Sequence, residues 1–572
     1  MRLIILSILL NQLAFSQQQF QTPFENGNGN QTTTYEECID FYKNLDLNFE
    51  TIAVQEMGKT DSGEPLHIVI FNAEKQFDFK QINQQKAVIL INNGIHAGEP
   101  DGIDATMLLL RNLALKKIEI PKNTVLVAIP IYNIGGSLNR NSFSRANQNG
   151  PESYGFRGNA RNYDLNRDFI KTDSRNSKSF QELFHLVNPD MFIDNHVSNG
   201  ADYQYTFTCI ATQHQRLGGK LGDFYKTEMH PQIVTDLRKK NIESTPYVNI
   251  HGETPDNGFS QFMDTPRYAT GYTSLFNVIG SVPETHMLKE FSSRVWVTYE
   301  YMIAALKFVD KNVEKIKNLR NTNNINYQAG SYFPLQWEID STKISTIDFM
   351  GFEAKNKTSA ISGKPRLYYD KTKPFTKKIS FFNHYKPTKQ VKIPRFYVIP
   401  KSQWPVIELL QLNKIEMTTL KKDTLIEVES YRIVDYKTQK NPYEGHYNHF
   451  NTQVSSTIKK IMFKKGDLLI STNQKGVKYI LETLEPEAVD SYFNWNFFDP
   501  ILQQKEYFSD YVFEDLAAQI LEENQKLKTE FETKKKQDPK FKENASWQLD
   551  WIYKNSVYYE KEHLQYPIYR IN

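Results

Sequence analysis

The first half of the chain alternates apolar runs of strand length with stretches in which apolar residues recur at helical spacing. Residues 66–71, 87–91 and 124–131 are predicted strands, and 103–115 is a predicted helix. Strands that alternate with helices indicate a mostly parallel sheet with helices on both faces. We therefore predict an α/β fold, a mostly parallel mixed sheet flanked by helices, that begins near Tyr35.

The pattern changes near residue 324. β-Branched and aromatic runs such as 425–431 and 467–471 are separated by turn residues, which predicts a β-rich, sandwich-like module. From Tyr511 onward, apolar residues again recur at helical spacing, and the charged run 530–536 is predicted to continue this helix on its solvated side.

An aromatic cluster lies between the β-rich module and the C-terminal helices. Its members are Tyr492, Phe493, Trp495, Phe497 and Phe498. Core packing is the preferred interpretation and ligand binding the second, because large aromatic side chains are mostly buried. In a core position they would dock the C-terminal helices onto the preceding domains.

The length of 572 residues exceeds what one hydrophobic core usually holds. We predict a first domain over 35–325, a β-rich domain over 326–490, and a helical segment over 491–572 that packs on the preceding domains.

The N-terminus has the features of a secretory signal peptide. A basic residue follows Met1, residues 3–10 are almost wholly apolar, and small residues precede Phe15 and end at Ser16. We predict a signal peptide over 1–16 and a flexible, polar leader over 17–34. The apolar run is too short to anchor the mature chain in a bilayer, and no later stretch is suited to span one. The mature protein is therefore predicted to be periplasmic or secreted.

Composition narrows the choice of partners. With 69 basic and 66 acidic residues the net charge is +3, which gives no general case for nucleic acid or an acidic membrane. Cys38 and Cys209 are the only cysteines. They are available to pair, but two cysteines in a chain of this length do not make a disulfide-held scaffold.

Polar side chains follow several of the predicted strands. His96 and Glu99 follow the strand at 87–91, and His196 and Glu284 each stand at the end of a later apolar run. In sheets of this kind ligands bind beyond the carboxyl ends of the strands. An imidazole and a carboxylate three residues apart can close on one metal ion, although this spacing alone is common by chance.

The segment 155–169 is predicted to be an ordered functional loop. It contains two glycines and three arginines and has little periodicity. A guanidinium can hold a carboxylate by two parallel hydrogen bonds. The alternative is that these arginines are solvated surface residues.

Together these motifs resemble zinc carboxypeptidases of the carboxypeptidase A family. The resemblance rests on His96-x-x-Glu99, on the Asp-Leu-Asn-Arg-Asp-Phe block at 164–169, on His196 after a strand, and on Glu284 in family order. It covers roughly residues 35–310. The metal pair and the block are specific in combination, whereas neither is specific alone.

The resemblance implies a catalytic site with one Zn²⁺ ion. His96, Glu99 and His196 would supply three protein ligands and leave one position for water, whose pKa falls to about 7 on zinc. Glu284 matches the general base that takes the water's proton and returns it to the leaving amine.

The resemblance also implies how substrate is held. Asn166 and Arg167 match the pair that grips the terminal carboxylate of a peptide. Arg157 matches the donor to the oxyanion, with Arg145 as the alternative, whereas Arg161 is better explained as a surface residue. Donors of this kind strengthen in the transition state.

The family's mobile tyrosine has two candidates in this chain, Tyr268 and Tyr272, of which we assign substrate binding to Tyr272. The chain departs from pancreatic-type spacing here and in its loop lengths, which set specificity. Asp202 either lines the cleft or belongs to a turn. His286 is predicted to pack beside the site rather than to act as a fourth ligand.

The pair His446 and His449 is a second possible metal motif, but a surface loop is the better explanation because short matches of this kind are frequent by chance. The motifs that remain predict a zinc-dependent metallocarboxypeptidase, with a peptide bearing a free C-terminal carboxylate as its substrate. The alternatives are a cell-wall peptide amidase or an N-acyl amino acid deacylase on the same site, or a non-catalytic peptide- or glycan-binding protein. The intact Glu284 argues against the last.

Overall fold

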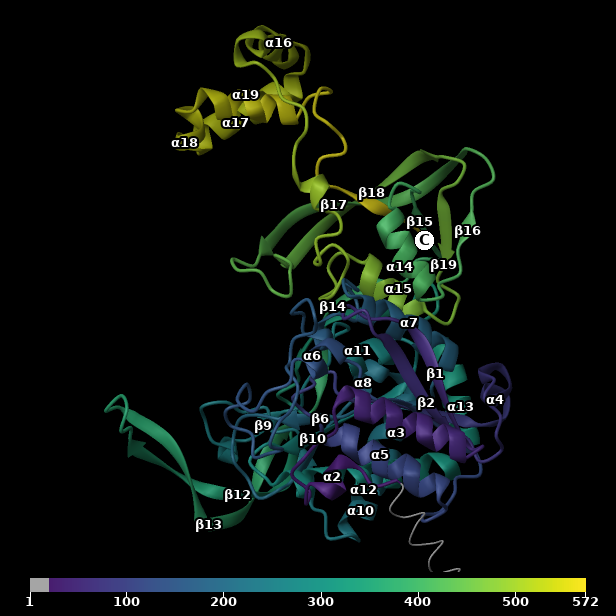
Figure 1. The fold of residues 1–572 in the computed structure, drawn as a ribbon. Coiled ribbons are helices and arrows are strands. Elements are labelled where there is room, and N and C mark those ends of the chain that lie inside the picture. Colours follow the sequence, from purple (N-terminus) through teal and green to yellow (C-terminus); the bar gives the residue numbers. More distant parts are fainter. Residues whose placement is uncertain (1–19) are drawn as a thin grey trace, which may run out of the picture.

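A computed structural model describes residues 20–572 (Figure 1). The predicted signal peptide, residues 1–16, lies outside the described residues. Within residues 20–572, no helix combines the length and the apolar character needed to cross a membrane.

The N-terminal part is built on a nine-stranded mixed sheet in the order β1-β2-β4-β3-β5-β10-β7-β8, with β6 paired to β10. The central pairs β4–β3, β3–β5 and β5–β10 are parallel, whereas β1–β2, β2–β4 and β10–β7 are antiparallel. The predicted mixed sheet is thereby confirmed. Its strands are β1 (Ile52–Lys59), β2 (Pro65–Phe71), β3 (Ala87–Asn92), β4 (Thr124–Ile129), β5 (Met191–Asp194), β6 (His196–Ser198), β7 (Phe207–Ala211), β8 (Ser244–Pro246) and β10 (Ile279–His286).

Helices cover both faces of this sheet. In β3, Ile89 and Ile91 face one apolar cluster, while Val88 and Leu90 face another, as the alternation of a strand requires. The strand is buried on both sides, which explains its unbroken apolar sequence. One face packs against α3 (Tyr35–Asn48), α5 (Asp101–Ala114) and α12 (Phe291–Lys311), and the other against α7 (Arg175–Val187) and α11 (Ala269–Ser274). The remaining helices of this part are α2 (Pro23–Asn26), α4 (Phe79–Gln85), α6 (Ile134–Leu138), α8 (His214–Leu217), α9 (Gly219–Phe224), α10 (His230–Arg238) and α13 (Val313–Thr322).

The predicted flexible leader is instead bound to the sheet-and-helix body from residue 20 onward. Phe20 is buried, and Thr22 caps α2. Thr32 donates a hydrogen bond to the buried carboxylate of Asp104, and Arg140 donates to the carbonyl oxygen of Thr32. The leader is polar because it supplies partners for buried charges, which the sequence pattern does not reveal.

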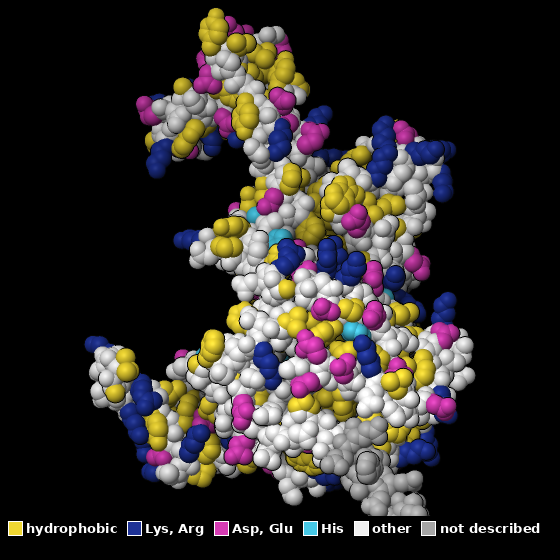
Figure 2. All heavy atoms as spheres, in the orientation of Figure 1, with side chains coloured by type: hydrophobic (Ala, Val, Ile, Leu, Met, Phe, Trp, Pro, Cys, Tyr) yellow, Lys and Arg dark blue, Asp and Glu magenta, His cyan; other side chains and the backbone are white. Residues whose placement is uncertain are grey.

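Two strand pairs follow the first domain. Strands β11 (Tyr332–Ile339) and β14 (Tyr385–Lys392) pair with one another, and β12 (Ser345–Thr358) and β13 (Pro365–Phe382) form a long hairpin that projects from the body (Figure 1). At its base β13 pairs with β9 (Phe259–Ser260) of the first domain. Lys and Arg side chains lie along the projecting hairpin (Figure 2), where charged residues discourage pairing with the edges of other chains.

The β-rich region also contains an antiparallel six-stranded sheet in the order β16-β19-β15-β20-β17-β18. Helices α14 (Trp404–Leu412) and α15 (Val477–Leu484) lie between this sheet and the first domain (Figure 1). This six-stranded sheet is thus layered on helices and does not pack on a second sheet as the predicted sandwich would. The strands are β15 (Phe396–Ile399), β16 (Thr418–Thr419), β17 (Thr424–Thr438), β18 (His449–Phe463), β19 (Leu468–Ser471) and β20 (Gln565–Ile571).

A single apolar core joins the two regions. Phe184 and Tyr272 of the first domain share it with Leu410 of α14 and Ile480 of α15, and Trp495 of the predicted aromatic cluster belongs to it too. The core-packing interpretation of that cluster is confirmed.

The prediction that the C-terminal helices pack on the preceding domains is wrong. Helices α16 (Asp510–Glu523), α17 (Gln525–Gln537), α18 (Pro539–Lys542) and α19 (Ala545–Lys554) stand away from the rest of the chain (Figure 1). Their apolar residues face one another in a small core of their own. The charged run belongs to a separate helix, because Asn524 ends α16 and its side chain caps α17.

Candidate active site

The parallel strands of the central sheet bring the predicted site residues together. His96 follows β3, His196 begins β6 directly after β5, and Glu284 lies in β10 opposite His196 in register. Strands β3, β5 and β10 run parallel to one another, so their carboxyl ends meet at the same edge of the sheet.

His96, Glu99 and His196 form a compact group of possible metal ligands. One donor atom from each lies within 4.8 Å of the others, and no second group of three such residues occurs in residues 20–572. Nδ1 of His96 lies 3.3 Å from Oε1 of Glu99, and Nδ1 of His196 lies 3.1 Å from Oε2 of the same carboxylate. All three side chains are buried.

Two further carboxylates orient the histidines. Nε2 of His96 lies 3.0 Å from Oδ1 of Asp164, and Nε2 of His196 lies 2.9 Å from Oδ2 of Asp194. A carboxylate only accepts, so each Nε2 donates to the carboxylate behind it, and each Nδ1, which faces Glu99, would be the nitrogen that ligates a metal ion held by the three side chains. Two imidazoles and one carboxylate, with each imidazole hydrogen-bonded through its other nitrogen to a further carboxylate, are the donor set that fits a catalytic zinc ion.

The charges around the group are strongly coupled. Burial would raise the pKa of Glu99, but Arg145 and His96 outweigh burial and hold it well below its ordinary value. Glu284 is also buried, and burial raises its pKa to about 8 against the opposing effect of His196. The two glutamates therefore differ in character: Glu99 stays ionised, whereas Glu284 is able to take up and release a proton near neutral pH.

Both candidate oxyanion arginines reach this group. Arg157 donates to Oδ2 of Asp164 through Nε at 3.0 Å and Nη2 at 2.8 Å, and its Nη1 lies 3.7 Å from Oε1 of Glu99. Arg145 donates from Nη1 to Oε1 of Glu99 at 2.8 Å. Arg161 is directed elsewhere, toward the carbonyl oxygen of Asp173.

The predicted carboxylate clamp lies on a single turn of 3-10 helix, Leu165–Arg167, which the Asp164 side chain caps by accepting from the Asn166 N–H. Oδ1 of Asn166 accepts from the Ala269 N–H at 3.1 Å, which leaves its Nδ2 as a free donor. The guanidinium of Arg167 lies 4.5 Å from the centre of the Tyr268 ring.

The possible metal ligands, Glu284, both candidate oxyanion arginines and the predicted clamp line one cavity of about 620 Å³. Its wall includes His96, Glu99, Arg145, Arg157, Asn166, Arg167, Asp194, His196, Tyr247, His251, Asp264, Tyr268, Thr270 and Glu284.

The assignment of substrate binding to Tyr272 is wrong. Its side chain is fully buried, and its hydroxyl donates to Oδ1 of Asn413 at 2.6 Å. Tyr268 precedes α11 and lines the cavity, whereas Tyr272 lies one helical turn later, where its ring packs against Phe169 and Phe184 in the core.

The other histidines and the two cysteines considered in the sequence analysis lie outside the group of possible metal ligands. His286 bonds Asp202 at 3.0 Å and stacks on Tyr203, so its predicted packing role agrees with the structure. His446 bonds Asp173 and His449 bonds Asp499, so these two histidines belong to separate contacts. Cys38 and Cys209 are buried free thiols.

The sequence reading missed two acidic residues of the site. Asp194 is the last residue of β5 and stands two positions before His196, the first residue of β6, and that spacing was a usable signal. Asp264 lies in an irregular segment with no motif around it. Its side chain is 1% exposed, and burial raises its pKa to about 7.

A buried imidazole–carboxylate–imidazole group at the strand ends of an α/β sheet, faced by a second carboxylate, defines the site of a metal-dependent hydrolase. Residues 39–243 match the family described as zinc carboxypeptidase. Residues 39–243 are therefore similar to zinc carboxypeptidases, which are metallopeptidases of the hydrolase class, and an additional C-terminal region follows them.

The chain also shows distant similarity to individual proteins. Carboxypeptidase 2 of Trichophyton rubrum is 21% identical over 486 residues, which cover 81% of this chain and 84% of the relative. Among solved structures, carboxypeptidase A from Helicoverpa armigera has a TM-score of 0.38 at 13% identity and covers 54% of this chain and 82% of its own. A metallo-carboxypeptidase from Burkholderia cenocepacia has a TM-score of 0.37 at 15% identity, with 49% and 70% covered.

Removal of Asp194 tests the orientation of His196. We expect Asp194→Ala to weaken zinc binding by about 10- to 100-fold, as loss of a hydrogen-bonded carboxylate behind a ligating histidine does. The measurement is zinc affinity by competition with a chelating dye. Asp202→Ala is the matched control, since Asp202 holds in the same way the imidazole of His286, which is not one of the possible metal ligands. Equal zinc affinity in the two variants would contradict the expectation.

Proposed function

We propose that this chain is a zinc-dependent metallocarboxypeptidase that hydrolyses the C-terminal peptide bond of its substrate. One observation supports this above the others: the possible metal ligands, Glu284 and the pair Asn166–Arg167 all line one cavity. A hydrolytic centre beside an amide–guanidinium pair suits a substrate that ends in a free carboxylate.

Substrate binding follows from the hydrogen bonds already made. Oδ1 of Asn166 is occupied by the Ala269 N–H, so Nδ2 donates to the terminal carboxylate. Nη1 of Arg167 donates to the Asn166 carbonyl oxygen at 2.8 Å, and Tyr268 lies against the guanidinium face. The guanidinium is thereby oriented before substrate arrives, which lowers the entropy cost of binding.

The chemical step assigns separate roles to the side chains. A zinc ion held by His96, Glu99 and His196 would activate water and polarise the scissile carbonyl. Glu284 takes the proton of the attacking water and transfers it to the leaving amine as the C–N bond breaks. Arg157 donates a hydrogen bond to the carbonyl oxygen as negative charge develops there.

The direct test compares the wild type with Glu284→Gln. We expect both to hold one zinc ion, because Glu284 is outside the ligand group, and hydrolysis to fall by about 10²- to 10⁴-fold in the variant through loss of the base. The assay follows release of the terminal residue from peptides with a free or an amidated C-terminus, and only the former should be cleaved. Glu300→Gln, at a buried glutamate of α12, is the control.

Substrates for this test include cell-wall peptides and N-acyl amino acids, since both present the same terminal carboxylate. Zinc in both proteins with hydrolysis in neither would favour a binding protein. The proposal also places the mature protein in a periplasm or outside the cell, which N-terminal sequencing of the mature form checks.

The cavity further supports a preference for a cationic C-terminal side chain. Asp264 accepts a hydrogen bond from Thr270, the residue next to Ala269, which bonds Asn166. Asp264 therefore lies beside the clamp. Among residues 20–572, no basic side chain lies within 4.0 Å of its carboxylate. A buried carboxylate without a cationic partner favours a ligand that supplies one.

This preference has a defined pH dependence. The pKa of Asp264 is raised to about 7 by burial, so the side chain is mostly neutral below that pH and ionised above it. We expect the ratio of kcat/KM for C-terminal Lys or Arg over Leu to increase from pH 6 to pH 8. Asp264→Asn should lower this ratio by roughly 30-fold or more at pH 8, because losing one partner of a buried charge pair costs about 2 kcal/mol or more. A ratio of kcat/KM that changes neither between pH 6 and pH 8 nor in Asp264→Asn would contradict this preference.

A further inference from the structure

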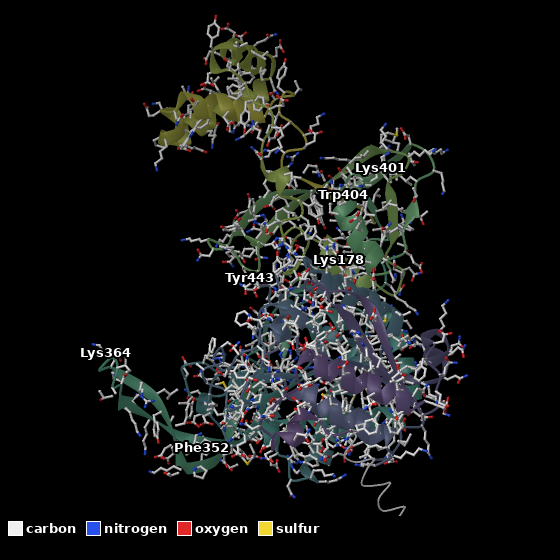
Figure 3. The ribbon with its side chains drawn as sticks, in the orientation of Figure 1. Lys178, Phe352, Lys364, Lys401, Trp404 and Tyr443 are labelled. Atoms are coloured by element: carbon white, nitrogen blue, oxygen red, sulfur yellow. The ribbon has the colours of Figure 1, made fainter. Side chains whose placement is uncertain are left out.

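The connection between β17 and β18, in the C-terminal region, reaches the active-site loop of the first domain. Tyr443 and His446 form a β-bridge through two backbone hydrogen bonds, of 2.7 and 3.1 Å. Glu444 and Gly445 stand between them with φ of 49° and 82°, the left-handed values of a tight two-residue hairpin turn. In Figure 3, Tyr443 lies where the first domain and the C-terminal region meet.

Glutamate is an unfavourable residue for the position it occupies. Glycine, asparagine and aspartate are the residues that normally adopt left-handed φ in such turns, because other side chains crowd the backbone. A residue whose backbone is held in a disfavoured conformation indicates a function for that position, because the surrounding structure must enforce the conformation. Here the longer side chain has a specific target: Oε2 of Glu444 accepts from the backbone N–H of Asp164 at 2.8 Å.

Asp164 connects this turn to three parts of the site. Its Oδ1 contacts Nε2 of His96 and accepts from the N–H of Asn166, each at 3.0 Å. Its Oδ2 accepts from Arg157. A shift of the Asp164 backbone would therefore move a metal-ligand candidate, the oxyanion donor and the clamp turn together.

Neighbouring contacts hold the turn against the same loop. Nε2 of His446 bonds Oδ2 of Asp173 at 2.8 Å. The backbone of Gly445 lies against the ring of Tyr163, so that a side chain added there would meet the ring at 3.2 Å. The turn is thus fixed on both sides of Glu444.

A second set of contacts from the C-terminal region holds the segment that carries Tyr268, which lines the cavity. Arg267 donates from Nε to Oδ1 of Asp490 at 2.7 Å, and its guanidinium lies 5.0 Å from the centre of the Trp495 ring. The next residue, Tyr268, packs on Arg167. Both the loop that carries Asp164 and the segment that carries Tyr268 are therefore held by residues of the C-terminal region.

We propose that the C-terminal region completes the active site, with Glu444 as a positioning residue that fixes Asp164 and, through it, His96, Arg157 and the clamp turn. The inference rests on the proposed function for the roles of those residues, but its central claim concerns zinc affinity and is independent of substrate.

The Glu444→Gly substitution distinguishes this positioning role from a merely structural one. Glu444→Gly removes the hydrogen bond to Asp164 and also relieves the left-handed backbone, so the Tm should not fall. We expect zinc affinity, measured by competition with a chelating dye on the full chain, to fall by about 10- to 100-fold. With saturating zinc, kcat should fall as well.

Two further variants sharpen the test. Glu444→Gln keeps an acceptor oxygen of the same reach and should restore zinc affinity to within about threefold of the wild type, since the bond to Asp164 is retained. Lys414→Gly is the matched control: Lys414 also has a left-handed φ, of 56°, in the C-terminal region, and its side chain is exposed. This change should leave zinc affinity as it is.

Zinc affinity of Glu444→Gly within about threefold of the wild type would overturn the proposal, since an outer contact that matters costs at least tenfold. So would an equal loss in Glu444→Gln, or a loss that follows a fall in Tm. A wild type that binds zinc but releases no terminal residue would defeat the proposed peptidase function alone, because zinc binding is measured without substrate.

Discussion

A charge buried in a protein must find enough partners to replace the water it has lost. The carboxylate of Asp164 meets that constraint by accepting from three different parts of the site at once. Burial would raise its pKa, but His96 and Arg157 outweigh burial and hold it well below its ordinary value. His96, Arg157 and the turn that carries Asn166 and Arg167 are consequently parts of one electrostatic unit, and their mutual geometry depends on where the Asp164 backbone is held.

The sequence predicted those features that follow from local pattern and from motif order. Apolar runs located β3 and β4, and their position before polar residues indicated which edge of the sheet would hold chemistry. His96, Glu99 and His196 do come together, and so does Glu284, because parallel strands bring their carboxyl ends to one edge. The mixed sheet, the β-rich region and the core role of Trp495 were predictable because each follows from the local pattern of apolar and aromatic residues.

The features that were missed depend on long-range contacts without a local signal. Tyr268 and Tyr272 look equivalent in sequence, and only the helix that starts between them sends one to the cavity and the other to the core. Asp264 carries no motif, and its importance comes from the burial that surrounds it. Glu444 lies 280 positions from its partner Asp164. The separation of the C-terminal helices from the rest of the chain was also unpredictable. An amphipathic pattern shows that a helix buries one face, but it does not show which other element that face packs against.

The six-stranded sheet has a consequence for the order in which the molecule is made. Strand β20, over Gln565–Ile571, lies between β15 and β17, and β17 leads directly into the turn that carries Glu444. During synthesis on the ribosome, β17 and β18 emerge long before β20 and have no link through the sheet to β15 until it arrives. The turn therefore acquires its final support only after about residue 571 has been added and exposed. Because α16 to α19 lie between β18 and β20 in the chain, the sheet that supports the turn closes only after those four helices have been synthesised.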